Sequence, residues 1–195
     1  RNRGLPVEQR FVKRIFDIVV ALVILVGTSP LFLLAAISIR LCDGGRVIYR
    51  QERLTKDGKS FWMFKFRSMY EDAERDGPRL AAKGDGRITP VGKILRRLHI
   101  DELPQLFNVL LGDMSLVGPR PPLPREVEQY TPQQMRRLTV TPGLTCYWQA
   151  TPRRNELTFD QWLALDLKYV RERGMGTDIR ILLDTALAVV NGEGV

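Results

Sequence analysis

The segment IVVALVILVGTSPLFLLAAISI, residues Ile18–Ile39, contains 22 residues and no charged side chain. A helix rises about 1.5 Å per residue, so a continuous helix of this length would cross the hydrocarbon core of a bilayer. The segment therefore predicts a membrane-inserted element. Three interpretations compete: a signal peptide, a helix that spans the membrane, and a helix-break-helix that enters and leaves on the same side.

The midpoint of this segment favours the third interpretation. Pro30 removes one intrahelical hydrogen bond and clashes with the preceding turn, and the hydroxyls of Thr28 and Ser29 can bind the carbonyl groups that this frees. A signal peptide is disfavoured, because its apolar region is shorter than this one and because Asp17 interrupts the start. We predict a re-entrant membrane hairpin over residues 15–41, with Ser29 and Pro30 at the break.

Charge supplies an independent argument. Basic side chains flank the segment on both sides: Lys13 and Arg14 precede it, and Arg40, Arg46 and Arg50 follow it. Basic flanks tend to stay in the cytoplasm, and a straight span cannot keep both of its ends there. We therefore prefer the re-entrant hairpin, although length alone also fits a simple span.

The composition narrows the classes of partner. The chain has 195 residues, enough for one domain with its own core, and its net charge of +8 favours anionic partners such as nucleotides or acidic lipid headgroups. Aromatic residues are few and no nucleic-acid-binding signature is present, so we predict no nucleic-acid partner. Cys42 and Cys146 match no metal or redox spacing, which is typical of a reducing cytosolic setting.

The remaining residues predict a small hairpin and several helices. Strands are expected at residues 47–49 and 60–66, with Asp57-Gly58 as the turn between them. Thr89-Pro90 opens a basic amphipathic helix, which fits both an ordinary surface helix and one at the membrane interface. Further helices are expected at residues 159–170 and 178–190. The predicted fold class is α+β and mainly helical: a re-entrant membrane hairpin, amphipathic interface helices and a small β-hairpin.

Asp101-Glu102 is the strongest candidate for chemistry. Asp101 is predicted to cap the next helix, which by itself would be a structural role, but a helix N-terminus also favours negative charge and suits a phosphate. Glu102 lies about 100° further around the helix, so the two carboxylates point to neighbouring sides of one site. One carboxylate can attack a phosphorus centre while the other holds a divalent metal. A Mg²⁺ ion held by Glu102 and by substrate phosphates fits the few protein ligands this metal uses.

A phosphate substrate also needs fixed positive charge. Arg120 lies on the stiff segment Gly118-Pro119-Arg120-Pro121 and is the best candidate for a bidentate contact. Further candidates for substrate binding are Lys65, Arg67, Arg153, Arg154, Asp166 and Asp178. Each basic residue also fits a solvated surface charge, and Asp166, on the apolar face of its helix, is either partnered or functional.

The motifs and their order resemble the bacterial sugar transferases, also called monotopic phosphoglycosyl transferases. The resemblance runs from about Val12 to Val190 and rests on KRIFD at 13–17, Ser-Pro at 29–30, KFRSM at 65–69, DELPQLFNVLLGDMSLVGPRP at 101–121 and TPGLTCYWQ at 141–149. It implies transfer of a sugar 1-phosphate from a UDP-sugar to undecaprenyl phosphate, with release of UMP, as the first membrane step of exopolysaccharide, O-antigen or related glycan assembly. It also implies that Asp101 is the nucleophile that carries the phosphosugar, that Glu102 is the Mg²⁺ ligand, and that Ser29-Pro30 bends the membrane helix.

The resemblance completes the predicted organisation. Residues 1–14 are expected to be a basic segment or linker, 15–41 the hairpin, and 42–195 the catalytic domain on the cytoplasmic face of the bacterial inner membrane. The expected partners are UDP-sugar, undecaprenyl phosphate and membrane lipid, and a homodimer is left open. The sequence departs from the family after Gln149, where Arg153 and Arg154 both fit the family's Arg-Asn pair, and Cys146 replaces a frequent Gly. The donor sugar therefore stays undetermined. The competing function is a non-catalytic membrane-anchored protein that binds acidic lipid.

Overall fold

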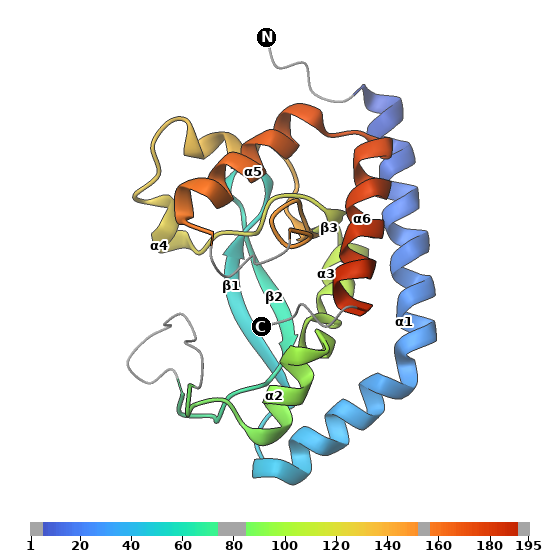
Figure 1. Ribbon diagram of the computed structural model, residues 1–195, viewed down its shortest axis with the longest axis vertical. Coiled ribbons are helices and arrows are strands. Elements are labelled where there is room, and N and C mark those ends of the chain that lie inside the picture. Colours follow the sequence, from blue (N-terminus) through green and yellow to red (C-terminus); the bar gives the residue numbers. More distant parts are fainter. Residues whose placement is uncertain (1–5, 74–84, 152–156, 191–195) are drawn as a thin grey trace.

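One long helix, α1 (Val7–Asp43), follows one edge of the molecule and bends in its second half (Figure 1). The computed structural model describes residues 6–73, 85–151 and 157–190. Within these ranges α1 is the one helix that is long and apolar enough to cross a membrane, and 11% of its most apolar window is buried in protein. Because α1 begins at Val7, residues 7–14, predicted as a basic segment or linker, belong to its first turns.

The predicted break is a bend in a helix that stays continuous. Pro30 lies inside α1 and has no N–H to give to the carbonyl of Val26, four residues earlier. The Ser29 hydroxyl donates to that carbonyl at 2.8 Å, and the Thr28 hydroxyl donates to Ile24 O at 2.7 Å. The Ser29 hydroxyl therefore has its predicted role, whereas Thr28 binds a carbonyl that Pro30 does not free. The Ser29 contact also explains why the helix bends without ending, since the carbonyl that proline frees keeps a donor.

The predicted β-hairpin is present. Strand β1 (Ile48–Leu54) pairs antiparallel with β2 (Ser60–Phe66), and the turn between them includes the 3₁₀ segment η1 (Lys56–Gly58). Asp57 and Gly58 both have positive φ, of 59° and 74°, as a tight hairpin turn requires. β1 is longer than the strand predicted at residues 47–49. The prediction ended too early because the later residues of β1 are polar. Several of them face solvent, and pairing with β2 rather than an apolar pattern makes them a strand.

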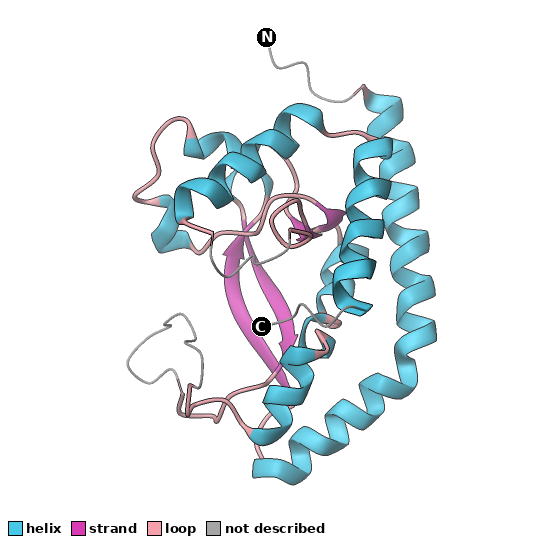
Figure 2. Cartoon of the chain, in the orientation of Figure 1, coloured by secondary structure: helices cyan, strands magenta, loops and turns pink. Residues whose placement is uncertain are grey.

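The remaining elements are mostly helical, as Figure 2 shows. In chain order they are α2 (Pro90–Arg97), η2 (Ile100–Glu102), α3 (Gln105–Leu111), β3 (Ser115–Val117), α4 (Pro124–Val127), η3 (Gln134–Thr139), β4 (Gly143–Thr145), α5 (Phe159–Glu172) and α6 (Met175–Val190). Thr89 caps α2 by accepting a hydrogen bond from Gly92 N, which confirms the predicted helix start. β3 and β4 form a parallel pair that the sequence did not predict, since each strand has only three residues.

The main hydrophobic core joins α1 to the rest of the chain. Ala21 of α1 packs with residues of β2, α3, β3, α5 and α6, among them Met63, Leu106, Tyr169 and Ile181. A second cluster joins the later part of α1 to the end of β2 and to α2, through Ala35, Ile39, Phe66 and Leu95. Both halves of the bent helix therefore pack on the same body.

Polar contacts fasten α1 at both ends. Near its start, the Arg14 guanidinium donates to Val109 O at 2.5 Å and Leu110 O at 2.8 Å, at the C-terminal end of α3, where positive charge is favourable. At its other end, Asp43 forms an ion pair with Arg67, just after β2. The apolar segment thus leaves and rejoins a single domain.

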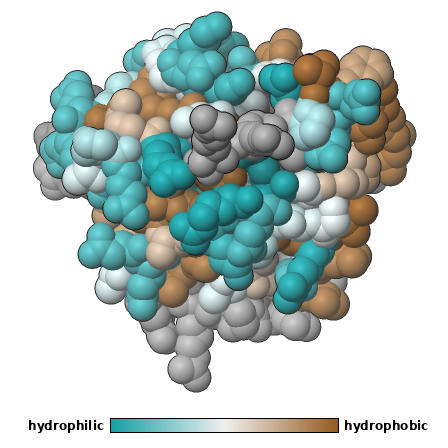
Figure 3. Space-filling view, turned by 90° about the horizontal axis from the view of Figure 1, so that it is seen from above, coloured by the Kyte–Doolittle hydropathy of each residue, from teal (hydrophilic) through white to brown (hydrophobic). Residues whose placement is uncertain are grey.

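The exposed surface of α1 is apolar, and its neighbours extend it. In Figure 3 the hydrophobic residues gather on the side of the molecule where α1 lies. Large apolar side chains exposed on the neighbouring helices include Ile94 and Leu98 on α2, Phe107 and Leu111 on α3, and Leu183 and Leu187 on α6. These helices have the amphipathic character predicted for interface helices.

Candidate functional site

Asp101 lies in a short 3₁₀ turn rather than at the cap of a helix. The chain reverses at His99, whose φ is 55°, and forms η2 before Pro104 precedes α3. The predicted N-cap role of Asp101 is therefore wrong, because α3 begins at Gln105 and no side chain caps it. Asp101 is instead 8% exposed, on the turn that links α2 to α3.

The surroundings of Asp101 make its ionised form costly. Burial, followed by the adjacent charge of Glu102, raises the pKa of Asp101 from 3.8 to about 6, against the opposing effect of Lys65 and Arg96. Among the described residues the Asp101 carboxylate forms no ion pair. A buried carboxylate that is ionised at neutral pH with little compensation is a suitable nucleophile.

Glu102 has the opposite electrostatic balance. Burial works against its ionisation, but Lys65, His99 and Arg120 together lower the pKa of Glu102. The Lys65 ammonium lies 2.7 Å from Glu102 Oε1. The structure therefore brings together three of the predicted residues, Lys65, Asp101 and Glu102, and keeps the last of them ionised.

Asn108 fixes how close Lys65 comes to Glu102, and the sequence analysis missed it. Its fully buried amide donates to Trp62 O at 2.8 Å and accepts from Phe64 N at 3.0 Å. This pair of bonds attaches α3 to the middle of β2, one residue before Lys65. The sequence signal that could have found it is the presence of a polar residue inside the apolar run LFNVLL.

Arg120 acts on Glu102 through its charge. Its guanidinium stands 6.0 Å from the ring centre of Trp148, and its charge lowers the pKa of both Glu102 and Asp166. Gly118, two residues before Arg120, lies against Gly143 of β4, and a side chain on either glycine would collide with the backbone of the other. The Arg120 segment is thus held directly beside the parallel strand pair.

Two predicted substrate-binding residues have structural partners. Arg67 is buried and paired with Asp43 at the end of α1, and Asp178 is fully buried with its Oδ2 atom 2.5 Å from Lys13 Nζ. The Tyr169 hydroxyl lies 2.9 Å from Asp178 Oδ1. These charges fasten α1 to the domain, and the substrate-binding role of Arg67 and Asp178 stays a prediction.

Asp166 has an ion-pair partner, and its predicted role in substrate binding stays a prediction. Its Oδ2 atom is 2.6 Å from Arg137 Nη2, and burial raises the pKa of Asp166 to about 6 against the effect of that arginine. Arg153 and Arg154 lie outside the described residues.

The residues at the site fit Mg²⁺ in the limited way the sequence predicted. No group of three or more potential metal ligands occurs in the described ranges 6–73, 85–151 and 157–190. Glu102 offers an ionised carboxylate beside Asp101, and a hard divalent cation would relieve the repulsion between these two carboxylates. Such a cation would need further oxygen ligands from a bound phosphate or from water.

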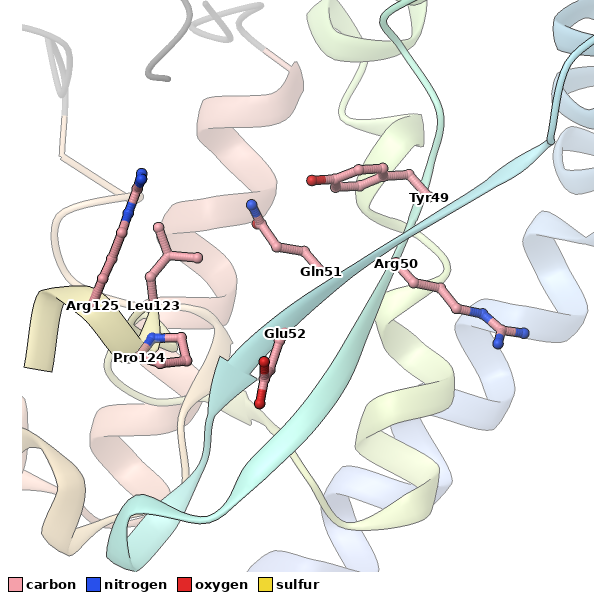
Figure 4. A pocket seen from close by; sticks show the side chains of 7 residues that line it. All are labelled: Tyr49, Arg50, Gln51, Glu52, Leu123, Pro124 and Arg125. Atoms are coloured by element: carbon pink, nitrogen blue, oxygen red, sulfur yellow. The ribbon is translucent and has the colours of Figure 1, made fainter. Parts of the chain in front are cut away.

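A separate depression of about 350 Å³ lies between β1 and α4 (Figure 4). It is open and is lined by Tyr49, Arg50, Gln51, Glu52, Leu123, Pro124 and Arg125. None of the predicted site residues lines it, so we do not place the chemistry there.

These features define a domain with one long, exposed apolar helix and, at one site, a buried carboxylate, a second acid and a lysine. Residues 8–192 match the family of bacterial sugar transferases, and the chain belongs to that family. It is 41% identical over 195 residues to the galactosyl transferase CpsE of Streptococcus agalactiae. The aligned region covers 93% of this chain and 43% of that protein.

Two other relatives match a similar share of this chain but differ in how much of their own length is matched. The undecaprenyl-phosphate galactose phosphotransferase of Salmonella typhimurium is 40% identical over 96% of this chain and 42% of its own length. The exopolysaccharide production protein ExoY of Sinorhizobium fredii is 37% identical over 93% of this chain and 87% of its own length. The chain thus spans less than half of the first two relatives and most of the third.

Proposed function

We propose that this protein transfers a sugar 1-phosphate from a UDP-sugar to undecaprenyl phosphate and releases UMP, as the first membrane step of exopolysaccharide, O-antigen or related glycan assembly. The observation that carries the proposal is the buried Asp101 carboxylate beside Glu102 and Lys65. The names of the relatives, which include undecaprenyl-phosphate phosphotransferases for galactose and glucose, support the substrate class.

The reaction has two displacements at one site. In the first, an Asp101 oxygen attacks the sugar-bearing phosphorus, the bond from that phosphorus to the bridging oxygen breaks, and UMP leaves with the electron pair. In the second, an oxygen of undecaprenyl phosphate attacks the same phosphorus and expels the Asp101 carboxylate. Covalent catalysis lets a soluble donor and a lipid acceptor use one nucleophile in turn.

The neighbouring side chains bind and offset charge. Glu102 would hold Mg²⁺, which when bound supplies charge neutralisation to the diphosphate. Lys65 orients Glu102 through their 2.7 Å contact, and Arg120 supplies a forked donor for a phosphate. The cost of burying Asp101 as a carboxylate keeps it reactive.

The two polar attachments of α1 support a re-entrant topology in the bacterial inner membrane. Arg14 and Asp43, which flank the apolar segment, both bind the same domain. A straight span would separate these ends by the thickness of the bilayer, whereas a bent helix returns to one face. We place that domain on the cytoplasmic face, where nucleotide sugars are made and where the basic flanks favour it.

The activity is tested by incubating the protein with UDP-hexoses, undecaprenyl phosphate and Mg²⁺ and measuring UMP. Release that depends on Asp101 is expected, and no UMP from any common UDP-hexose would overturn the proposal. If the protein only binds acidic lipid, binding will be indifferent to Asp101 and Glu102 and lost at high salt.

The topology is tested by cysteine labelling in intact cells. Cys42 is exposed near the end of α1, whereas Cys146 is buried, so the native chain already carries one useful probe. The matched variant replaces Cys42 with Ser and carries Arg10→Cys, which is exposed near the start of α1. Both thiols should label only from the cytoplasmic side, and labelling from opposite sides would refute re-entry.

A further inference from the structure

The backbone that carries Arg120 is held at four consecutive carbonyl groups. Their donors come from three different places: Gly143 N binds Pro119 O at 2.9 Å, Arg137 Nη2 binds Arg120 O at 3.3 Å, Arg53 Nη1 binds Pro121 O at 2.9 Å, and Leu54 N binds Pro122 O at 3.0 Å. Three of the four residues are prolines, which have no N–H to offer in return. The segment is therefore fixed through its carbonyls alone.

Two of these donors are buried arginines. Arg137 is 8% exposed, and its guanidinium also binds the Tyr130 hydroxyl at 2.8 Å and the Asp166 carboxylate at 2.6 Å. Arg53 is 5% exposed, and its Nε and Nη2 atoms both bind Gln51 Oε1, at 3.0 and 2.6 Å. Arg53 gives Nη1 to the Arg120 segment and its other two nitrogens to Gln51. Arg137 uses Nη2 for both Asp166 and Arg120 O, and its Nη1 binds Tyr130.

Stability alone does not account for these two residues. Burying a guanidinium is costly, and a well-packed apolar side chain often replaces a buried ion pair without loss of stability. A fork that binds a neighbouring residue and a loop carbonyl together has a geometric use that an apolar side chain does not.

We propose that Arg137 and Arg53 are positioning residues, which fix the backbone at Arg120 so that its guanidinium stands over Trp148. The inference deepens the proposed function, because it assumes that Arg120 contacts the phosphates of the donor. Neither residue touches the substrate. Both act by removing freedom from a long side chain that would otherwise lose it on binding.

The test uses lysine substitutions, which keep the charge and remove the fork. In Arg137→Lys one ammonium replaces the two nitrogens that together contact Asp166, Arg120 O and Tyr130, so the fork that orients the Arg120 contact is lost. In Arg53→Lys the ammonium cannot reach both Gln51 and Pro121 O. We expect roughly a 10- to 100-fold loss in kcat/KM, mainly through a higher KM for the UDP-sugar. Arg136→Lys, an exposed neighbour in η3, is the matched control and should leave the kinetics unchanged.

A double-mutant cycle with Arg120→Ala separates positioning from structure. If Arg137 acts only through Arg120, Arg120→Ala/Arg137→Lys will be no worse than Arg120→Ala alone. Losses that multiply would overturn the proposal, as would a lowered melting temperature with unchanged KM. The same cycle is read by calorimetric titration with UDP-glucose. If the two substitutions weaken UDP-glucose binding non-additively but no UMP is released, the proposed function is refuted and the positioning role is kept. If the protein shows neither binding nor turnover, both are refuted.

Discussion

The fold contains two pairs of acidic residues, each with one lysine. One pair holds elements of the fold together, and the other belongs to the candidate site. The structural pair, Asp17 and Asp178, shares Lys13, whose Nζ atom is 3.6 Å from the first and 2.5 Å from the second. The site pair, Asp101 and Glu102, has Lys65, whose Nζ atom is 2.7 Å from Glu102 and which, among the described residues, forms no ion pair with Asp101. The two clusters have the same charges and differ in how those charges are satisfied.

Donors surround the structural pair. Asp17 accepts hydrogen bonds from the Ser115 hydroxyl at 2.7 Å and from Leu116 N at 3.4 Å, and the Tyr169 hydroxyl lies 2.9 Å from Asp178. In the described part of the chain, Asp101 has no comparable set of side-chain donors. Burial raises the pKa of Asp178 as well as that of Asp101, so the pKa alone does not distinguish them. The supply of donors marks one carboxylate as structural and the other as reactive.

The largest expected effect comes from removing the charge of the site pair. Asp101→Asn should reduce UMP release by more than about 10³-fold, because the amide cannot form the covalent adduct. The same change should stabilise the fold at pH 7 by up to about 3 kcal/mol, because a pKa raised to about 6 means that ionising Asp101 costs folding free energy. Both quantities are measured on protein in one detergent, by a UMP assay and by thermal unfolding.

The pH dependence of the stability difference is the control for this variant. Between pH 6 and 3.8 the wild-type Asp101 becomes protonated in the folded protein, so the stability gap should close as the pH falls. A gap that stays constant with pH would show that the stabilisation has another cause. Full turnover in Asp101→Asn would remove Asp101 from the role of nucleophile.

The structural pair should respond in the opposite sense. Asp178→Asn leaves the partly buried Lys13 without its closest counter-charge. Because burial also raises the pKa of Asp178, removing its charge offsets part of this loss, and we expect a net fall of about 1–3 kcal/mol in the free energy of unfolding. At a temperature where the variant is still folded, kcat should stay within a few-fold of wild type, because Asp178 does not contact the site pair. A large fall in kcat with unchanged unfolding would support the substrate-binding role of Asp178.

Local sequence signals predicted the parts of the molecule that depend on local geometry. The Asp57-Gly58 turn and the Thr89 cap are each decided by a few adjacent residues, and the structure confirms both. At Ser29-Pro30 the helix continues through the predicted break, and the Ser29 hydroxyl binds the carbonyl that Pro30 frees. The site was predicted in part for a similar reason, since Asp101-Glu102 is adjacent in sequence and Lys65 and Arg120 lie in recognisable motifs.

Partners that are distant in sequence could not be predicted in this way. Asp178 and Lys13 are 165 residues apart, and the partner of Arg67 is at the end of α1. From the sequence these residues were indistinguishable from the basic and acidic residues of a substrate site. The parallel pair of β3 and β4 was missed because three residues are too few to show a period of two.

The smallest effect, and the one that separates the two clusters most finely, is a shift in the pH profile. An attacking Asp101 must be ionised, so the rate of UMP release should fall on the acid side of about pH 6, close to tenfold per pH unit.

Lys65 lowers the pKa of both members of the site pair, so Lys65→Met should move this acid limb to higher pH in addition to reducing the rate. Lys59→Met, an exposed lysine at the start of the hairpin's second strand, is the matched control and should leave the limb in place. Asp178→Asn should also leave it in place, because its carboxylate is tied to Lys13 and not to the site. A limb that moves with Asp178 and not with Lys65 would show that the reactive and the structural carboxylates had been assigned the wrong way round.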